Sequence, residues 1–433
     1  MKAAGARQQT LFLTGVNALV RALGLLLRMI LSRILGAEIM GIAELAQSVH
    51  MIAITPLTSG LPLAVSRLTA LSSVKARQKP LMAALRLARY ASVCLIPVLL
   101  LFSSFIARLM GDVRVLPSLW FTAPCVLILG YSAAYNGYCY GVSRSELPAI
   151  SELIEQAGRL AFTLLFLQGL KHLTAPWLAA VPVAATMAAE LVGLWFVIHS
   201  LHLKDCDTSI TANTQRKVFN LAWPTTVSRL IQTLLRSLTA ILIPLRLQAS
   251  GLSAAEATAR LGMLNGMVMP LMMLPCVFTS ALSMVALPRI AQAETNPKEL
   301  KRLLGICTGG CVPVASLCAA ALYVCAPVFS NVLYRLPELT PLFRLCAPMT
   351  VLFACVHLTS SILSSLGQQT ASMIGSSAVS VVTLVLTWLW TADPNLRLTG
   401  VVWAQSVGQI LSLAFNSIIF VCWNRKRNQT VFL

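Results

Sequence analysis

Apolar runs of about 20 residues recur along the whole chain, and each is long enough to cross a bilayer as an α-helix. Hydrophobic residues make up 57% of the chain and charged residues 11%, which excludes an ordinary water-soluble globule. The first run follows Lys2 without a small-residue cleavage site, so we interpret it as a span rather than a signal peptide. The sequence predicts an all-α polytopic membrane protein with about 12 transmembrane helices. The expected helices cover residues 10–32, 42–70, 90–110, 116–140, 147–169, 176–199, 218–245, 260–288, 303–328, 340–366, 370–391 and 398–422.

The formal charge of +19 comes mostly from short segments between the apolar runs. With alternating sides, the segments on the N-terminal side hold about twice as many basic residues as those on the other side, so we expect both termini to be cytoplasmic. Because topology accounts for this charge, we expect no nucleic-acid partner.

The chain divides into two halves at its longest polar stretch, HLKDCDTSITANTQRK. The helices at 42–70 and 260–288 carry similar motifs, PLTSGLPLAVSRL and PCVFTSALSMVALPRI. We expect two six-helix lobes related by a pseudo-twofold axis along the membrane normal, with the substrate between them near the midplane. The predicted divisions are an N-terminal lobe at 1–203, a cytoplasmic loop at 204–217, a C-terminal lobe at 218–423 and a basic cytoplasmic tail at 424–433.

The first helix of each half carries two arginines seven residues apart. Seven residues of an α-helix return to within about 20° of the starting direction, so each pair lies on one face. An arginine at the bilayer centre costs about 2.5–3.5 kcal/mol, and its guanidinium suits phosphate oxygens, so we expect both faces to line a water-filled, anion-binding cavity. The predicted substrate-binding residues are Arg21, Arg28, Arg229, Arg236, Asn17 and Gln232.

The alternative is that acids neutralise these arginines, or that those nearer to helix ends extend to the interface. The acids that we place clearly within helices are Glu152, Glu155 and Glu190, which are also the candidates for proton or sodium coupling. Arg159 follows Glu155 by four residues, so these two could equally form a static pair on one helix face.

Breaks are predicted in two helices, within ITPLTSGLPL and MPLMMLPCVF. Proline removes a backbone donor and bends a helix, so these segments are gating candidates, although proline is also common in membrane helices without such a role. The gating candidates are Pro56, Gly60, Pro62, Pro270 and Pro275.

Several of these segments resemble the stage V sporulation protein B type of polysaccharide transporter, within the superfamily of multidrug, oligosaccharidyl-lipid and polysaccharide exporters. The resemblance rests on RALGLLLRMILSRILGAEIMG, TSGLPLAVSRL, NGYCYGVSRSELPAISELIEQAGRL and the block from IPLRLQASGLSAAEATARL to SALSMVALPRI. It implies a flippase in the bacterial cytoplasmic membrane that moves an undecaprenyl-diphosphate-linked glycan, either a peptidoglycan precursor or a polysaccharide unit, by alternating access between two six-helix lobes. The basic positions of the family's first helix fall on Arg21 and Arg28. Members often have two further C-terminal helices, so the place of any lipid-tail groove stays open.

Two other function classes remain. A cation-coupled multidrug exporter of the same superfamily is the alternative, although its cavity would favour acids over arginines. A membrane glycosyltransferase or polymerase needs a catalytic loop, which the sequence does not offer, so we expect no enzyme, catalytic residue or cofactor. Four cysteines between 307 and 325 share a helix face without nearby histidine or acid, so we expect packing and no metal site. The expected partners are the lipid-linked glycan, membrane lipids and cell-envelope glycosyltransferases or polymerases.

Overall fold

The computed structural model describes residues 2–169, 172–203, 212–293 and 296–430, and this part of the chain is helical, without a strand. It forms two compact units, which are described separately below. Unit 1 comprises Met1–Leu31 and Glu38–Ile241, and unit 2 comprises Ser32–Ala37 and Leu242–Leu433. The lobe boundaries predicted from the sequence remain a prediction.

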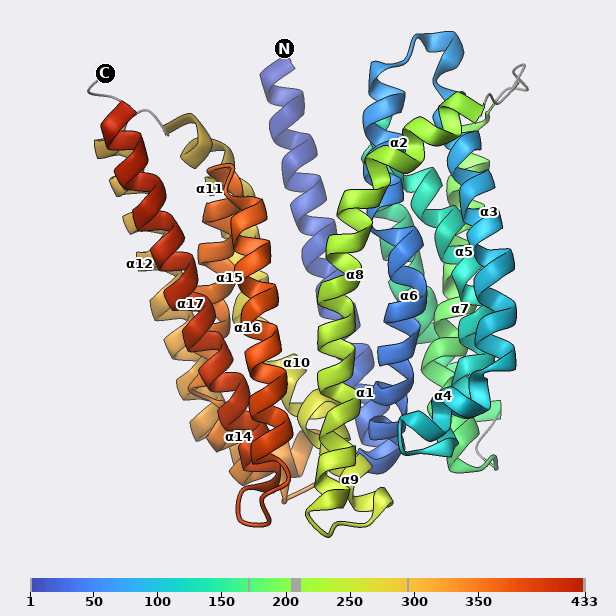
Figure 1. Ribbon diagram of the computed structural model, residues 1–433, viewed down its shortest axis with the longest axis vertical. Coiled ribbons are helices and arrows are strands. Elements are labelled where there is room, and N and C mark those ends of the chain that lie inside the picture. Colours follow the sequence, from blue (N-terminus) through green and yellow to red (C-terminus); the bar gives the residue numbers. More distant parts are fainter. Residues whose placement is uncertain (1, 170–171, 204–211, 294–295, 431–433) are drawn as a thin grey trace. The chain divides into compact units, whose positions relative to one another are not determined.

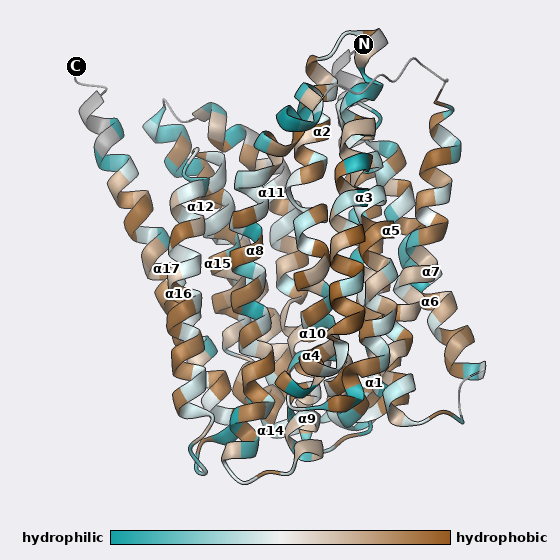
Figure 2. Cartoon of the chain, turned by 45° about the vertical axis from the view of Figure 1, so that its right-hand side comes forward, coloured by the Kyte–Doolittle hydropathy of each residue, from teal (hydrophilic) through white to brown (hydrophobic). Residues whose placement is uncertain are grey.

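The expected all-α membrane fold is confirmed. Among the described residues, eight helices are long and apolar enough to cross a membrane, or nine if one bent pair counts as a single span. Helix α6 has the length of a span but carries Glu152, Glu155 and Arg159 in its middle. Figure 2 shows apolar residues along the lengths of the helices, and large apolar side chains such as Leu101, Trp195 and Leu317 are exposed. Outward apolar faces of this kind are typical of helices solvated by lipid.

Unit 1 is built mainly from the first eight α-helices. Within it α6 packs on α7, and α5 packs on α7, α3 and α2. The connection at 72–77 lies at the same end of this unit as the start of α1, whereas α4 lies at the opposite end (Figure 1). The helices are α1 (Lys2–Thr58), α2 (Gly60–Leu71), α3 (Gln78–Leu101), α4 (Ser103–Leu109), α5 (Leu116–Gly141), α6 (Glu146–Gly169), α7 (Ala175–Leu201) and α8 (Ala212–Ala249), with short 3₁₀ turns at Val74–Ala76 and Val113–Val115.

Helix α1 contains two arms that meet at Gly36. This residue has φ 73° and ψ 175°, a conformation that is essentially restricted to glycine. Arg28 and Glu44, each eight residues from Gly36, form an ion pair with 3.2 Å between Nη1 and Oε1. Eight helical residues span about 12 Å, so this contact requires the chain to reverse direction between the arms. The two arms correspond to the expected helix at 10–32 and the first part of that at 42–70.

Close backbone contacts pack α2 within unit 1. A Cβ on Gly60 would lie 2.1 Å from the carbonyl oxygen of Ala222 on α8, and a Cβ on Gly137 of α5 would lie 2.6 Å from that of Pro62. Glycine at these two positions therefore allows α2 to approach both neighbouring helices.

Unit 2 contains the remaining helices. Within it α15 contacts α11, α12 and α17, and α16 packs on α17. Its main apolar cluster joins buried residues of α11, α12 and α15, among them Ile290, Cys311 and Leu358. The elements are α9 (Ala254–Leu261), a π-helical segment (Gly262–Val268), α10 (Met269–Met272), α11 (Leu274–Gln292), α12 (Pro297–Val324), α13 (Ala326–Val328), a second π-helical segment (Phe329–Leu333), α14 (Leu339–Cys346), α15 (Met349–Ser365), α16 (Gln369–Trp390) and α17 (Arg397–Thr430).

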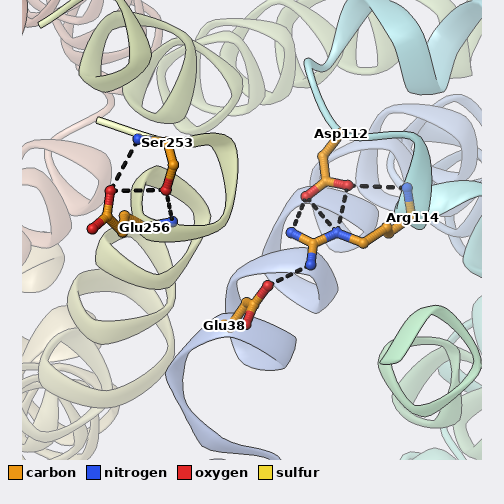
Figure 3. Close-up of polar contacts among 5 residues, drawn as sticks. All are labelled: Glu38, Asp112, Arg114, Ser253 and Glu256. Atoms are coloured by element: carbon orange, nitrogen blue, oxygen red, sulfur yellow. Dashed lines mark hydrogen bonds and ion pairs between the residues drawn. The ribbon is translucent and has the colours of Figure 1, made fainter. Parts of the chain in front are cut away.

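The start of α9 is fixed by a capping box, shown in Figure 3. The Ser253 hydroxyl accepts a hydrogen bond from the Glu256 backbone N–H at 3.3 Å, and the Glu256 carboxylate accepts from the Ser253 backbone N–H at 3.0 Å. These bonds satisfy two backbone donors that a helix start otherwise leaves unpaired.

Candidate functional site

The two arginine faces predicted from the sequence both lie in unit 1. Arg21 and Arg28 are on the first arm of α1, and Arg229 and Arg236 are on α8 before Ile241, where unit 1 ends. The sequence interpretation assigned one face to each half of the chain, and that division into two lobes stays a prediction. Within unit 1, α8 contacts the second arm of α1.

These contacts are polar. Thr55 donates to the hydroxyl of Thr233 at 3.3 Å, and Ser237 donates to the carbonyl oxygen of Ser48 at 3.0 Å. The α8 arginines are therefore held on a helix that is bonded to α1.

Three of the four arginines have no acidic partner within the described part of the chain. Arg21, Arg229 and Arg236 are exposed, and no ion pair within 4 Å joins them to an acid of the described chain. Asn17 and Gln232, on the same helix faces, are half-buried. Three guanidinium groups within long apolar helices are thus left without a neutralising charge from the described protein.

Arg28 differs, because Glu44 on the second arm of α1 neutralises it. The sequence interpretation did not count Glu44 among the acids within helices. For Arg28 the alternative of structural pairing is therefore supported by the geometry. The signal that could have found it is the equal separation of both residues from Gly36.

The predicted static pair of Arg159 with Glu155 is not formed. Arg159 instead pairs with Glu190 of α7, and Glu155 accepts a hydrogen bond from Ser151 at 2.8 Å between Oγ and Oε1. Gly193 of α7 determines this arrangement, because a Cβ there would lie only 2.4 Å from Oε1 of Glu155. The Glu155 carboxyl group therefore rests against the α7 backbone, and the guanidinium reaches across to α7.

The three coupling candidates have different surroundings. Glu155 and Glu190 are 7% and 3% exposed, and Glu152, on the same helix as Glu155, is exposed. Glu155 and Glu190 are therefore buried within unit 1, and Glu152 lies at the surface of the described chain.

A second charged cluster, which the sequence interpretation missed, joins Glu38, Asp112 and Arg114 (Figure 3). The Arg114 guanidinium bonds the Asp112 carboxylate through Nη2 at 2.8 Å and Nε at 2.9 Å, and it also pairs with Glu38. Asp112 is the N-cap of the 3₁₀ turn Val113–Val115 and Arg114 lies within that turn, whereas Glu38 lies two residues after Gly36. This cluster fastens the second arm of α1 to the turn before α5.

The gating candidates coincide with observed helix breaks. Helix α1 ends at Thr58 and α2 begins at Gly60, with Pro56 before the break and Pro62 after it. In unit 2, Pro270 lies in α10 and Pro275 in the first turn of α11, after the π-helical segment. The breaks are confirmed, and their role in gating stays a prediction.

The described residues do not contain a group of three or more histidine, cysteine, aspartate or glutamate side chains that could hold a metal ion. Cys307 and Cys311 are buried in the apolar cluster of unit 2. Their surroundings fit the predicted packing role.

Comparison with known proteins agrees with the resemblance seen in the sequence. The pattern of the family described as "Polysaccharide biosynthesis protein" matches residues 6–294, which is more than half of the chain. Stage V sporulation protein B of Bacillus subtilis (strain 168) is 26% identical over 429 residues, covering 93% of this chain and 81% of that protein.

Solved structures show the same fold. The lipid II flippase MurJ, in an inward closed conformation, has a TM-score of 0.77 at 13% identity, covering 95% of this chain and 87% of that one. An inward-facing multidrug resistance transporter of the MATE family, within the MOP superfamily, has a TM-score of 0.69 at 15% identity and covers 95% of both chains. The chain is a multi-pass membrane protein with this transporter fold, and it belongs to the polysaccharide biosynthesis protein family.

Proposed function

We propose that this protein is a flippase that moves an undecaprenyl-diphosphate-linked glycan across the bacterial cytoplasmic membrane by alternating access, without changing a covalent bond. One observation carries the proposal: Arg21, Arg229 and Arg236 lie within long apolar helices and have no acidic partner in the described chain.

Arginine charges inside a membrane are costly unless they are neutralised. Each arginine costs about 2.5–3.5 kcal/mol at the bilayer centre, so three cost about 7.5–10.5 kcal/mol unless water or an anion compensates them. A diphosphate offers several acceptor oxygens and more than one negative charge, and guanidinium groups bind such oxygens in pairs. Asn17 and Gln232 add neutral donors on the same faces. A cationic drug, the cargo of the alternative, would be repelled by these arginines.

The relatives support the same class of cargo. The names of the family and of two relatives refer to polysaccharide biosynthesis, sporulation and a lipid II flippase. We propose that envelope glycosyltransferases supply the glycan on the cytoplasmic side and that polymerases consume it outside. Both termini then face the cytoplasm. The helix breaks around Gly60 and Pro275 act as gating points, and carboxyl groups buried in unit 1 couple transport to an ion.

The test is transport of a labelled polyprenyl diphosphate glycan in liposomes, measured beside thermal stability in detergent. Arg21→Ala and Arg229→Ala should each weaken glycan binding about 10- to 100-fold, because one charge-assisted contact contributes about 1.5–3 kcal/mol. Stability should be unchanged or higher, since a charge is removed from the membrane interior. Lysine replacements should keep part of the activity, because lysine retains the charge without the planar donor pair.

The matched controls are Arg33→Ala, near the end of the first arm of α1 at Gly36, and Arg216→Ala, near the start of α8. Each removes an exposed arginine. Both should leave transport unchanged. Full transport by both Arg21→Ala and Arg229→Ala would refute the anion site.

A second measurement tests whether water reaches the arginine-bearing faces of α1 and α8. In a variant without native cysteines, cysteines introduced by Gly24→Cys and Gln232→Cys should react with small aqueous thiol reagents. Protection of both in lipid and in detergent would show that these faces are packed against protein.

A further inference from the structure

Ionisable side chains gather inside unit 1, away from the arginine faces. Glu155 and Arg159 come from α6, Glu190 from α7 and His50 from the second arm of α1. We propose that these four residues form a proton-binding site in the membrane interior, and that its loading and unloading drives transport. Only the second part of this proposal rests on the proposed function.

Glu155 and Glu190 interact electrostatically across the contact between α6 and α7. Arg159 holds Glu190, and Ser151 donates to Glu155. The charges near Glu155 are those of Glu152 and Arg159 on its own helix and Glu190 on α7. On the other helices that meet here, the Cys125 thiol of α5 lies near Glu190 and Arg159, and His50 lies within electrostatic range of Arg159.

The cluster has more acidic than basic groups, because the two carboxyl groups of Glu155 and Glu190 share the one guanidinium of Arg159. With both carboxyl groups ionised, the pair and Arg159 carry one net negative charge in a site that is almost fully buried. Two carboxylates in contact disfavour joint ionisation, and an uncompensated buried charge is costly. One proton on the Glu155–Glu190 pair makes the cluster neutral.

His50 is a further buried polar group near Arg159. Its side chain is 3% exposed, and within the described part of the chain its Nδ1 atom has no hydrogen-bond partner. Buried polar atoms are nearly always paired, so this exception needs an explanation. An imidazole with a free nitrogen can accept and release a proton, which gives the carboxyl pair a neighbouring relay.

The same geometry favours a proton over a metal cation. Hard cations in proteins take six or more oxygen ligands. Around Glu155 the protein offers the Ser151 hydroxyl and the Glu190 carboxylate, and the latter is already held by Arg159. The described chain contains no cluster of acids, histidines and cysteines that could hold a metal ion.

Loading and unloading would bias two conformations of the transporter. The protonated cluster is neutral and stable in a closed, dry environment, whereas the unprotonated cluster is stable only when water reaches it. A ligand that binds one conformation better shifts the equilibrium toward it, and here the ligand is the proton.

The first experiment follows the proton directly, without a transport substrate. Infrared spectra of the whole protein in liposomes are recorded between about pH 5 and about pH 9, the range in which buried glutamates titrate. We expect a protonated-carboxyl band that disappears as the pH rises. Glu155→Gln should abolish it. Glu152→Gln, the matched exposed variant on the same helix, should keep a protonated-carboxyl band that titrates.

A positional variant keeps every carboxyl group. Gly193→Ala should shift the band without removing it, because the added Cβ would lie 2.4 Å from Oε1 of Glu155 and displaces that carboxyl. The proposal is overturned if the band is absent at every pH, persists at about pH 9, or survives in Glu155→Gln.

The second experiment tests coupling in the same liposomes, with an imposed pH gradient and an internal pH dye. One proton per cycle shifts the distribution of the labelled glycan between leaflets about tenfold per pH unit. Glu155→Gln should lose this dependence. A titrating band with glycan transport that ignores the gradient overturns the coupling. If no glycan is transported at all, the proposed function fails, while the infrared result still decides the proton site.

Discussion

Gly60 gives the sharpest test of how unit 1 is packed. It lies where α1 ends and α2 begins, against the backbone of α8. In Gly60→Ala the new Cβ would be 2.1 Å from the carbonyl oxygen of Ala222 and 2.4 Å from the hydroxyl oxygen of Thr226. Real Cβ atoms essentially never approach another atom within 3.0 Å, so the two backbones must separate by about 0.9 Å, the difference between 3.0 and 2.1 Å.

The expected cost follows from this displacement. Overpacking a close-packed interior costs about 1–3 kcal/mol of stability. Because a backbone carbonyl moves less easily than the end of a side chain, we expect the cost of Gly60→Ala to lie near the upper limit of this range. Gly15→Ala is the matched control, since Gly15 lies within α1 with nothing within 4 Å of its would-be Cβ. Alanine is the better helix former by about 0.5–1 kcal/mol, so this variant should be stabilised. The changes in the free energy of unfolding should have opposite signs in the two variants and differ by about 1.5–4 kcal/mol.

The assay is thermal unfolding of both variants in one detergent, followed by the fraction that remains monodisperse after heating. Gly60→Ala should unfold at a lower temperature than the unsubstituted protein, and Gly15→Ala at the same or a higher one. A Gly60→Ala protein as stable as the unsubstituted one would refute the close contact between α2 and α8. Equal losses in both variants would show that the effect is not steric.

Two further predictions concern charge and topology. A double-mutant cycle of Arg28→Ala and Glu44→Ala should give a coupling energy of about 0.5–3 kcal/mol, because the two side chains are in direct contact; a coupling near zero would show that the pair is not formed. Cysteine labelling from each side of the membrane should show the alternation that the basic residues predict, and a site on the wrong side would overturn the topology. The cytoplasmic sites are Lys75, Thr211 and Lys298, of which Thr211 lies outside the described residues, and the outer sites are Asp112, Gly251 and Asp393.

The helical fold was predictable because lipid solvation leaves a strong, local signal in the sequence. An apolar run of about 20 residues has few alternatives to a spanning helix, and Gly60, Pro62 and Pro275 mark breaks that occur where expected. These features depend on neighbours along the chain, which the sequence shows directly.

The ion pairs were not predictable in the same way, because they depend on which helices meet. The four-residue spacing predicts Arg159 beside Glu155, but this rule treats the helix as isolated. In the folded chain Gly193 admits the Glu155 carboxyl group against α7, and Glu190 of α7 takes the guanidinium. Only knowledge of the packing between α6 and α7 decides between the two partners.

The reversal at Gly36 has a consequence for how the chain enters the membrane. Arg28 and Glu44 are far apart while the chain is extended, and each would meet the hydrocarbon as a bare charge. Because the two arms of α1 fold back at a single glycine, the charges can join before either is buried. We therefore expect these arms to leave the translocation machinery as one hairpin, with the arginine already neutralised when it passes from the lateral gate into lipid.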